Sequence, residues 1–145
     1  MLVNGGFETG DLSGWTASSS AIRAQLLGFG GELGNYAVSL GPTASTETLS
    51  QLVPTVLGER YVVSFYVLGD PEGSSNALTV TWDGATLVAL SDVFGGITRY
   101  SFDVVGNGGF MELRFSYLDD GTGLFVDQVS VAPATGPACS FRAGR

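Results

Sequence analysis

Residues 76–90 read NALTVTWDGATLVAL, and this stretch decides the fold class. Its apolar residues Leu78, Val80 and Trp82 alternate with threonines, which is the period of a strand with one buried face. Asp83 and Gly84 then precede a second apolar run, and an Asp-Gly pair between two such runs favours a tight type I′ turn. We therefore expect a β-hairpin whose buried face carries Trp82.

The same alternation recurs along most of the chain, and glycine-rich turns separate the runs. No segment has the pattern of an amphipathic helix, and no internal repeat is present. The sequence therefore predicts an all-β domain, a two-sheet antiparallel β-sandwich. Besides the hairpin, the expected strands are Ile22–Leu27, Tyr36–Leu40, Thr48–Val53, Tyr61–Leu68, Tyr100–Val104, Met111–Tyr117 and Leu124–Val131.

The length of 145 residues fits one domain with a genuine hydrophobic core. We assign the sandwich to residues 1–132. Prolines and glycines interrupt the pattern beyond that point, so residues 133–145 are expected to form a flexible tail. Cys139 is the only cysteine and has no partner for an internal disulfide, which leaves a free thiol or a bridge between two copies.

The composition removes most catalytic chemistries. The chain has no histidine, and its six basic residues are all arginine, which excludes Ser-His-Asp catalysis, Schiff-base lysines and the P-loop lysine. Zinc, haem and iron–sulfur sites also lack ligands. The remaining carboxylates, hydroxyls, amides and aromatic rings suit the binding of glycans or of hard cations such as calcium.

The net charge of −8 limits the partners. It repels the phosphate backbone of nucleic acids and anionic membrane surfaces. No run of 18 apolar residues offers a membrane span. We therefore expect neither nucleic-acid binding nor membrane insertion.

Two carboxylates stand beside apolar positions. Glu8 follows Phe7 in the glycine-rich opening NGGFETGDLSGWT, in which Phe7 and Trp15 are expected to anchor the segment to the core. Asp127 shares the parity of Val129 and Val131, so its side chain is expected to point with theirs toward the core edge. A buried carboxylate is costly without a compensating cation, and here that cation is an arginine or a metal ion.

The opening NGGFETGDLSGWT, the middle segments TLSQLV and GERYVVSFYV, and the closing FVDQVSV resemble the galactose-binding-like jelly rolls of bacterial carbohydrate-binding modules. The pattern is similar to modules of families 4, 9 and 22, and to secreted single-domain proteins with a PEP-CTERM sorting tail. The resemblance covers about Leu2 to Val131 and implies a secreted, extracellular jelly roll. The ending VAPATGPACSFRAGR lacks the motif, apolar helix and basic end of that tail, so no surface anchor is inferred.

The resemblance also implies a structural calcium. In the family, a glutamate after the first phenylalanine, loop carbonyls and an aspartate of the last strand hold the ion, and these positions match Glu8 and Asp127 here. Glu32 or the carbonyl of Gly34 is the implied third ligand. This chain has Asp127-Gln128 where the family has two aspartates. The alternative is that Glu8 and Asp127 pair with arginines or cap turns.

The family's sugar site lies on one sheet face or in the loops at its edge. Parity turns a set of polar residues away from the core, and a tyrosine, a guanidinium and several hydroxyls suit a sugar ring. The alternative is an ordinary solvated face with a surface ion pair between Glu112 and Arg114. The candidate ligand-binding residues are Tyr66, Thr79, Thr81, Glu112 and Arg114.

Two functions follow from these expectations. The first is non-catalytic binding of polysaccharide or cell-surface glycan. We expect no enzyme, because the paired Asp119 and Asp120 precede Gly121-Thr122-Gly123 and read as a loop. The alternative is a structural cell-surface or matrix protein that self-associates. The resemblance to PEP-CTERM proteins implies a link to exopolysaccharide and biofilm, which fits both functions. Lysine, the usual guard of edge strands, is missing from the chain.

Overall fold

The computed structural model describes residues 2–18, 22–26, 36–40, 46–69, 76–91, 96–119 and 124–134. These residues form strands and turns and contain no helix that could span a membrane. Glu32, Gly34, Cys139 and the tail beyond residue 134 lie outside the described residues. The strands are β1 (Thr16–Ala17), β2 (Ile22–Leu26), β3 (Tyr36–Leu40), β4 (Glu47–Pro54), β5 (Arg60–Leu68), β6 (Asn76–Trp82), β7 (Ala85–Ser91), β8 (Ile97–Val105), β9 (Phe110–Asp119) and β10 (Leu124–Pro133).

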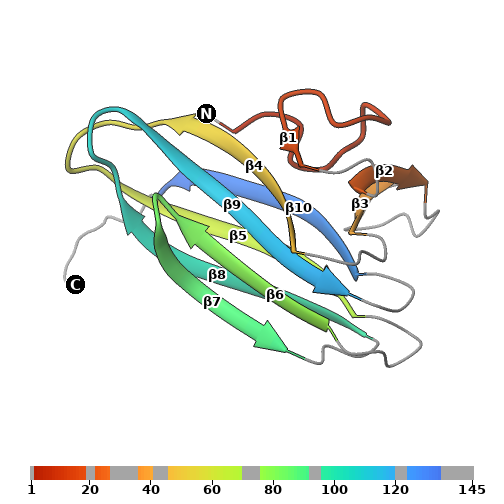
Figure 1. Ribbon diagram of the computed structural model, residues 1–145. Helices are drawn as coiled ribbons and strands as arrows, with labels where there is room; N and C mark the ends of the chain where they lie inside the picture. The colour runs from red at the N-terminus through yellow and green to blue at the C-terminus, as the bar shows by residue number, and fades with distance from the viewer. Residues whose placement is uncertain are drawn as a thin grey trace.

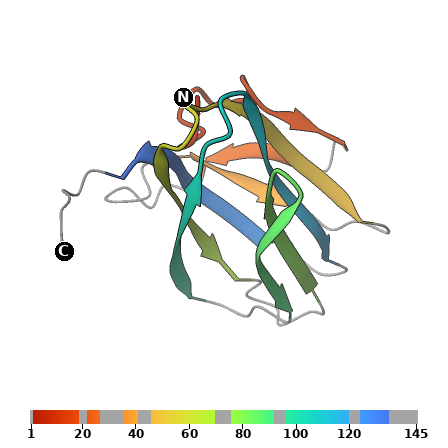
Figure 2. The same ribbon diagram turned by 90° about the vertical axis from the view of Figure 1, so that its left-hand side faces the viewer.

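The strands form two five-stranded antiparallel sheets that pack face to face (Figures 1 and 2). The first sheet has the order β1-β4-β9-β6-β7, and the second has the order β2-β3-β10-β5-β8. The chain crosses repeatedly from one sheet to the other, so most neighbouring strands are distant in sequence. The predicted two-sheet antiparallel β-sandwich is confirmed.

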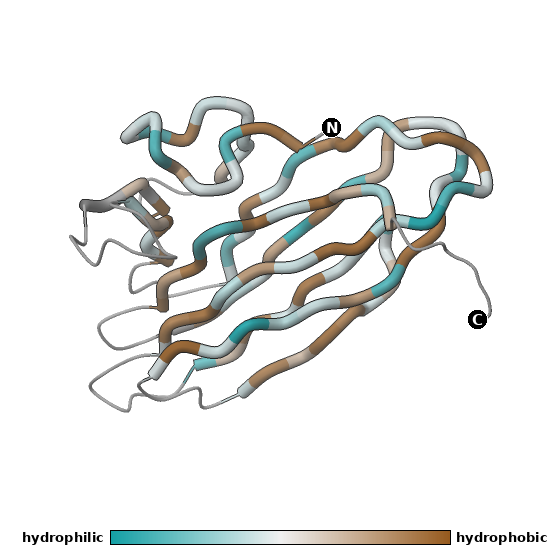
Figure 3. Tube along the Cα trace, turned by 180° about the vertical axis from the view of Figure 1, so that it is seen from behind, coloured by the Kyte–Doolittle hydropathy of each residue, from teal (hydrophilic) through white to brown (hydrophobic). Residues whose placement is uncertain are grey.

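Apolar side chains of both sheets fill the space between them, and the alternation of apolar and polar residues along several strands is visible in Figure 3. Phe65 of β5 lies edge-on to Phe115 of β9, with ring centroids 5.2 Å apart. This contact links β9, the middle strand of the first sheet, to β5 of the second sheet, and each such aromatic pair adds about 1 kcal/mol beyond its buried area. The predicted core positions of Phe7, Trp15 and Trp82 are confirmed.

The hairpin predicted from residues 76–90 is present as β6 and β7. Asp83 has φ 49° and Gly84 has φ 89°, and positive φ at both central residues is the requirement of a type I′ turn. A register shift between Val80 and Thr81 adds a bulge next to the turn. The local sequence was sufficient to predict this element, because the turn residues themselves permit the geometry.

The opening segment fastens the two sheets together at one side of the sandwich. Val3 exchanges two hydrogen bonds with the side chain of Gln51 on β4, at 2.7 and 3.0 Å. Two residues later, the carbonyl of Gly5 accepts a 2.9 Å hydrogen bond from Val129 N of β10. A Cβ atom on Gly5 would lie 1.9 Å from the carbonyl oxygen of Val129, so only glycine fits this crossing.

Candidate functional sites

The first candidate site lies where the opening segment meets β3 and β10. Glu8 is held there because Phe7, at φ 56°, turns the chain sharply while its ring is buried in the core. Glu8 Oε2 accepts a 2.8 Å hydrogen bond from Tyr36 N, the first residue of β3. This bond draws a carboxylate onto the start of β3, across 28 residues of sequence.

Asp127 reaches the same region from β10, but not by the predicted parity. In the ladder with β5, Asp127 pairs with Tyr66, whereas Val131 pairs with the core residue Val63. A bulge between Asp127 and Ser130 shifts the register, and Gln128 within it has φ 50°. The expectation that Asp127 points with Val129 and Val131 is therefore wrong, because the bulge reverses the alternation between them.

The expected burial of Asp127 is nevertheless correct, because only 3% of the residue is exposed. Its Oδ1 accepts a 2.7 Å hydrogen bond from Gln128 N, whereas the buried Oδ2 has no hydrogen-bond partner among the described residues. Burial raises the pKa of Asp127 to about 7; the Gln128 N–H opposes this rise, and the nearby Glu8 carboxylate adds to it. The site therefore holds two neighbouring carboxylates and one unsatisfied oxygen.

This donor set fits a hard cation only if backbone oxygens complete it. Calcium takes six to eight oxygen ligands, and no group of three or more acidic, histidine or cysteine side chains that could hold a metal occurs among the described residues. The predicted third contributors, Glu32 and Gly34, lie outside the described part of the chain. Glu8 and Asp127 are the two predicted ligands that the fold does bring together.

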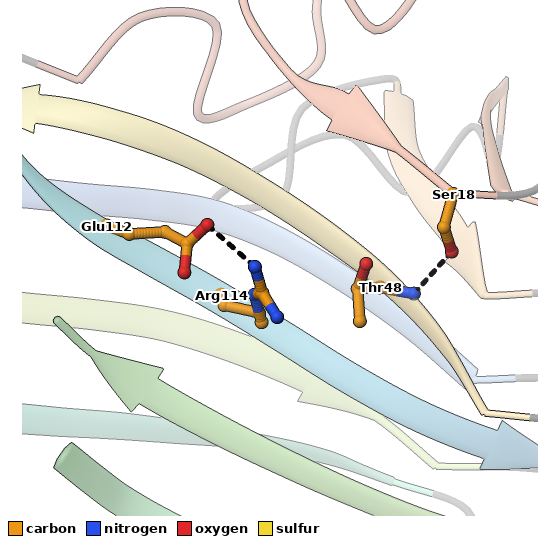
Figure 4. Close-up of polar contacts among 4 residues, drawn as sticks. All are labelled: Ser18, Thr48, Glu112 and Arg114. Atoms are coloured by element: carbon orange, nitrogen blue, oxygen red, sulfur yellow. Dashed lines mark hydrogen bonds and ion pairs between the residues drawn. The ribbon is translucent and has the colours of Figure 1, made fainter. Parts of the chain in front are cut away.

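The second candidate site is the outer face of the first sheet. Glu112 and Arg114 project from β9, the middle strand of that sheet, and Arg114 Nη2 donates a 2.9 Å hydrogen bond to Glu112 Oε2 (Figure 4). Arg114 is flanked in register by Ser50 of β4 and Thr81 of β6. We call this surface the hydroxyl face; it comprises Thr16, Thr48, Ser50, Thr79, Thr81, Thr86 and Ser116 around the Glu112–Arg114 pair.

Tyr66 does not belong to the hydroxyl face. It lies on β5 in the second sheet, opposite Arg99 on β8, and its parity turns it away from the core. The outer faces of the two sheets look in opposite directions (Figure 2). A single site that combines Tyr66 with Thr79, Thr81, Glu112 and Arg114 is therefore ruled out.

An aromatic residue that was not among the predicted site residues also lies on the hydroxyl face. Phe110 begins β9 and is 67% exposed. It lies opposite Pro54 at the end of β4, two residues before Glu112 on the same side of the strand. Its parity with Glu112 and Arg114 was the available signal, because a phenylalanine in the polar set of an alternating strand is exposed.

Comparison with known proteins shows what the fold resembles. No family model and no curated protein matches the sequence. Among solved structures, the TmCBM61 module in complex with β-1,4-galactotriose has a TM-score of 0.70 and 24% identity, covering 92% of this chain and 97% of the module. A family 16 carbohydrate-binding module matches with a TM-score of 0.66 and 15% identity, over 90% and 98% of the two chains.

The CBM22-1 xylan-binding domain of Paenibacillus barcinonensis Xyn10C matches with a TM-score of 0.65 and 17% identity, over 88% of this chain and 90% of that domain. The predicted jelly roll is thus confirmed as a fold that carbohydrate-binding modules adopt. Fold alone does not fix a ligand.

Proposed function

We propose that the chain is a non-catalytic carbohydrate-binding domain that holds a polysaccharide strand on its hydroxyl face. The observation that carries this proposal is the outward row of β9, in which an exposed Phe110, the acceptor Glu112 and the donor Arg114 follow one another. Alternate residues of a strand are about 7 Å apart, so these three side chains lie side by side along one outer surface.

Each member of the row matches one part of a sugar ring. The face of Phe110 packs on the apolar C–H face of a pyranose. The guanidinium of Arg114 donates to ring and hydroxyl oxygens, and Glu112 accepts from hydroxyl groups. Because Arg114 is already neutralised by Glu112 and the protein carries a net charge of −8, the favoured ligand is a neutral polysaccharide.

The second part of the proposal is a structural calcium held by Glu8 and Asp127. The orphaned Oδ2 of Asp127 and its proximity to Glu8 support it, since a divalent cation would offset the repulsion between the two carboxylates. Bound there, the ion would tie the opening segment to β10. Its role is in stability, because the calcium site and the hydroxyl face involve different sheets.

An extracellular setting accompanies the proposal, in which the ligand is a polysaccharide or a cell-surface glycan. The neighbours described with β-1,4-galactotriose and with xylan make galactan and xylan the first polymers to test. The alternative is a structural surface or matrix protein without a glycan ligand, and it predicts no saturable binding to any polymer.

The position of the sugar site is tested by paired substitutions on opposite faces. Phe110→Ala and Arg114→Ala should each weaken binding about tenfold or more. Their controls, Ile97→Ala and Arg99→Ala, remove similar side chains from the other sheet and should leave affinity within about twofold. Affinity electrophoresis in gels that contain the polysaccharide measures the affinity of all four variants. Equal losses of affinity from substitutions on both faces would reject the proposed site.

The calcium site is tested by thermal unfolding with calcium and with chelator. Calcium should raise the melting temperature of the wild type, by an amount that grows with its concentration. Asp127→Asn should abolish this rise, whereas Asp103→Asn, which changes an exposed carboxylate on β8, should retain it. A wild-type melting temperature that is the same with calcium and with chelator would contradict the proposed calcium site.

A further inference from the structure

The edge strand β8 is long, regular and open on one side. It pairs with β5 in an unbroken register over nine residues, from Ile97 with Leu68 to Val105 with Arg60. It is the last strand of its sheet, so its other edge pairs with no described strand (Figure 1). It contains no proline or lysine, two residues that commonly keep such edges from pairing.

The side chains of β8 are chemically symmetric about Ser101. The sequence ITRYSFDVV places Arg99 and Asp103 two residues before and after Ser101, and Ile97 and Val105 four residues before and after it. These five residues share the outward face of the strand, and all five are exposed. On the other face, Tyr100 and Phe102 flank Ser101 and are half-buried.

If two β8 strands pair antiparallel with Ser101 opposite Ser101, each of these side chains lies opposite a complementary one. Arg99 of each copy lies opposite Asp103 of the other, Ile97 lies opposite Val105, and Tyr100 lies opposite Phe102. Arg99 and Asp103 have no ion-pair partner among the described residues of their own chain. Their neighbours on β5, Tyr66 and Val62, are uncharged.

We infer that β8 is a self-association edge, through which a second copy of this chain pairs its own β8 about a two-fold axis at Ser101. The contact is isologous, as most homodimer contacts are, and it joins the two β2-β3-β10-β5-β8 sheets into one continuous sheet. The strand is complementary to itself in charge and in side-chain size, which favours a second copy as the partner. An unrelated strand would need the same order of apolar and charged residues.

The expected dimer is reversible. One strand edge buries less than the roughly 1,600 Å² of a standard interface, so the dimer should form as concentration rises. The hydroxyl face lies on the other sheet, and both copies therefore keep it free. Where the polysaccharide proposal also holds, the pair presents two binding faces, but self-association itself does not depend on that proposal.

The experiment is sedimentation equilibrium of the full chain, in reducing agent to remove any Cys139 bridge, up to about 1 mM. The wild type should move from 15.0 kDa toward twice that mass. In Arg99→Asp, the new aspartate of each copy lies opposite Asp103 of the other, so the dimer contains two acidic pairs. In Asp103→Arg, the new arginine of each copy lies opposite Arg99 of the other, so the dimer contains two basic pairs. Each should weaken dimerisation roughly tenfold.

The double variant Arg99→Asp/Asp103→Arg exchanges the charges and restores both pairs at unchanged net charge. It should return the dissociation constant to within about threefold of the wild type. Circular dichroism checks that each variant is folded. A folded wild type that stays monomeric, or a dimer that the single variants leave unchanged or the double variant fails to restore, would overturn the inference.

Discussion

Asp127 is a buried carboxylate, and its burial is unfavourable for the ionised form. Its Oδ2 has no hydrogen-bond partner within the described part of the chain, and Glu8 lies near enough to raise its pKa further. An isolated carboxylate of this kind either takes up a proton or recruits a cation. We therefore expect Asp127 to be protonated in the metal-free protein and ionised when the proposed calcium is bound.

The metal-free protein should lose stability as pH rises. In the unfolded chain the Asp127 carboxyl ionises with its ordinary pKa of 3.8, whereas in the folded state its pKa is about 7. The folded state thus holds the extra proton between these values, and the free energy of unfolding should fall across that interval by roughly 4 kcal/mol, then level off. Urea unfolding in chelator at a series of pH values measures this slope.

Asp127→Asn is the control, because the amide cannot ionise and the slope attributed to Asp127 should vanish. Saturating calcium should also remove the slope at neutral pH, since a cation favours the ionised form. A wild-type profile in chelator that coincides with that of Asp127→Asn would show that this carboxyl does not titrate as described.

The burial of Asp127 was predicted correctly but from an alternation that the bulge breaks, and the direction of its side chain was predicted wrongly. Two-residue alternation through Val129 and Val131 indicated a buried carboxylate. The bulge that reverses the alternation is centred on Gln128 at positive φ, and no glycine or asparagine marks it. Phe110, by contrast, follows the alternation of β9 and was predictable as an exposed aromatic.

The opening segment is the element that fixes this site. It crosses from β4 to β10 within three residues, and Gly5 makes the crossing possible by close backbone approach to Val129. The hairpin of β6 and β7 depends on its own turn residues, whereas this crossing depends on a contact between the two ends of the described chain. That is why the hairpin was predictable in detail and the crossing was not.

Gly5→Ala should destabilise the protein by roughly 2–4 kcal/mol. The new Cβ would lie 1.9 Å from Val129 O and 2.8 Å from Leu2 Cδ2, so the segment must move and lose its hydrogen bond to β10. Gly109→Ala is the matched control, because its Cβ would meet nothing closer than 3.5 Å. It should change stability by less than about 0.5 kcal/mol.

Chemical denaturation of both variants gives the two free energies directly. Similar values for Gly5→Ala and Gly109→Ala would show that the crossing adapts to a methyl group at no cost. In calcium, the loss from Gly5→Ala should be accompanied by weaker calcium stabilisation, because the same segment carries Glu8.

At the scale of the whole molecule, the two sheets divide the chemistry between them. The first presents hydroxyls, Phe110 and the Glu112–Arg114 pair, and the second carries the carboxylate site and the open β8 edge. Alternation in the sequence showed which residues leave the core, but not which sheet they join. Tyr66 was grouped with Arg114 for that reason, since sheet membership is set by crossovers between distant strands.

We propose that this jelly roll binds a neutral polysaccharide without acting on it. The most direct measurement is titration of the folded protein, in calcium, against a panel of neutral and acidic polysaccharides that begins with galactan and xylan. We predict saturable binding to at least one neutral polymer, weaker or no binding to acidic ones, and no release of reducing ends. A folded protein that binds no polymer, or that cleaves the one it binds, would contradict the account.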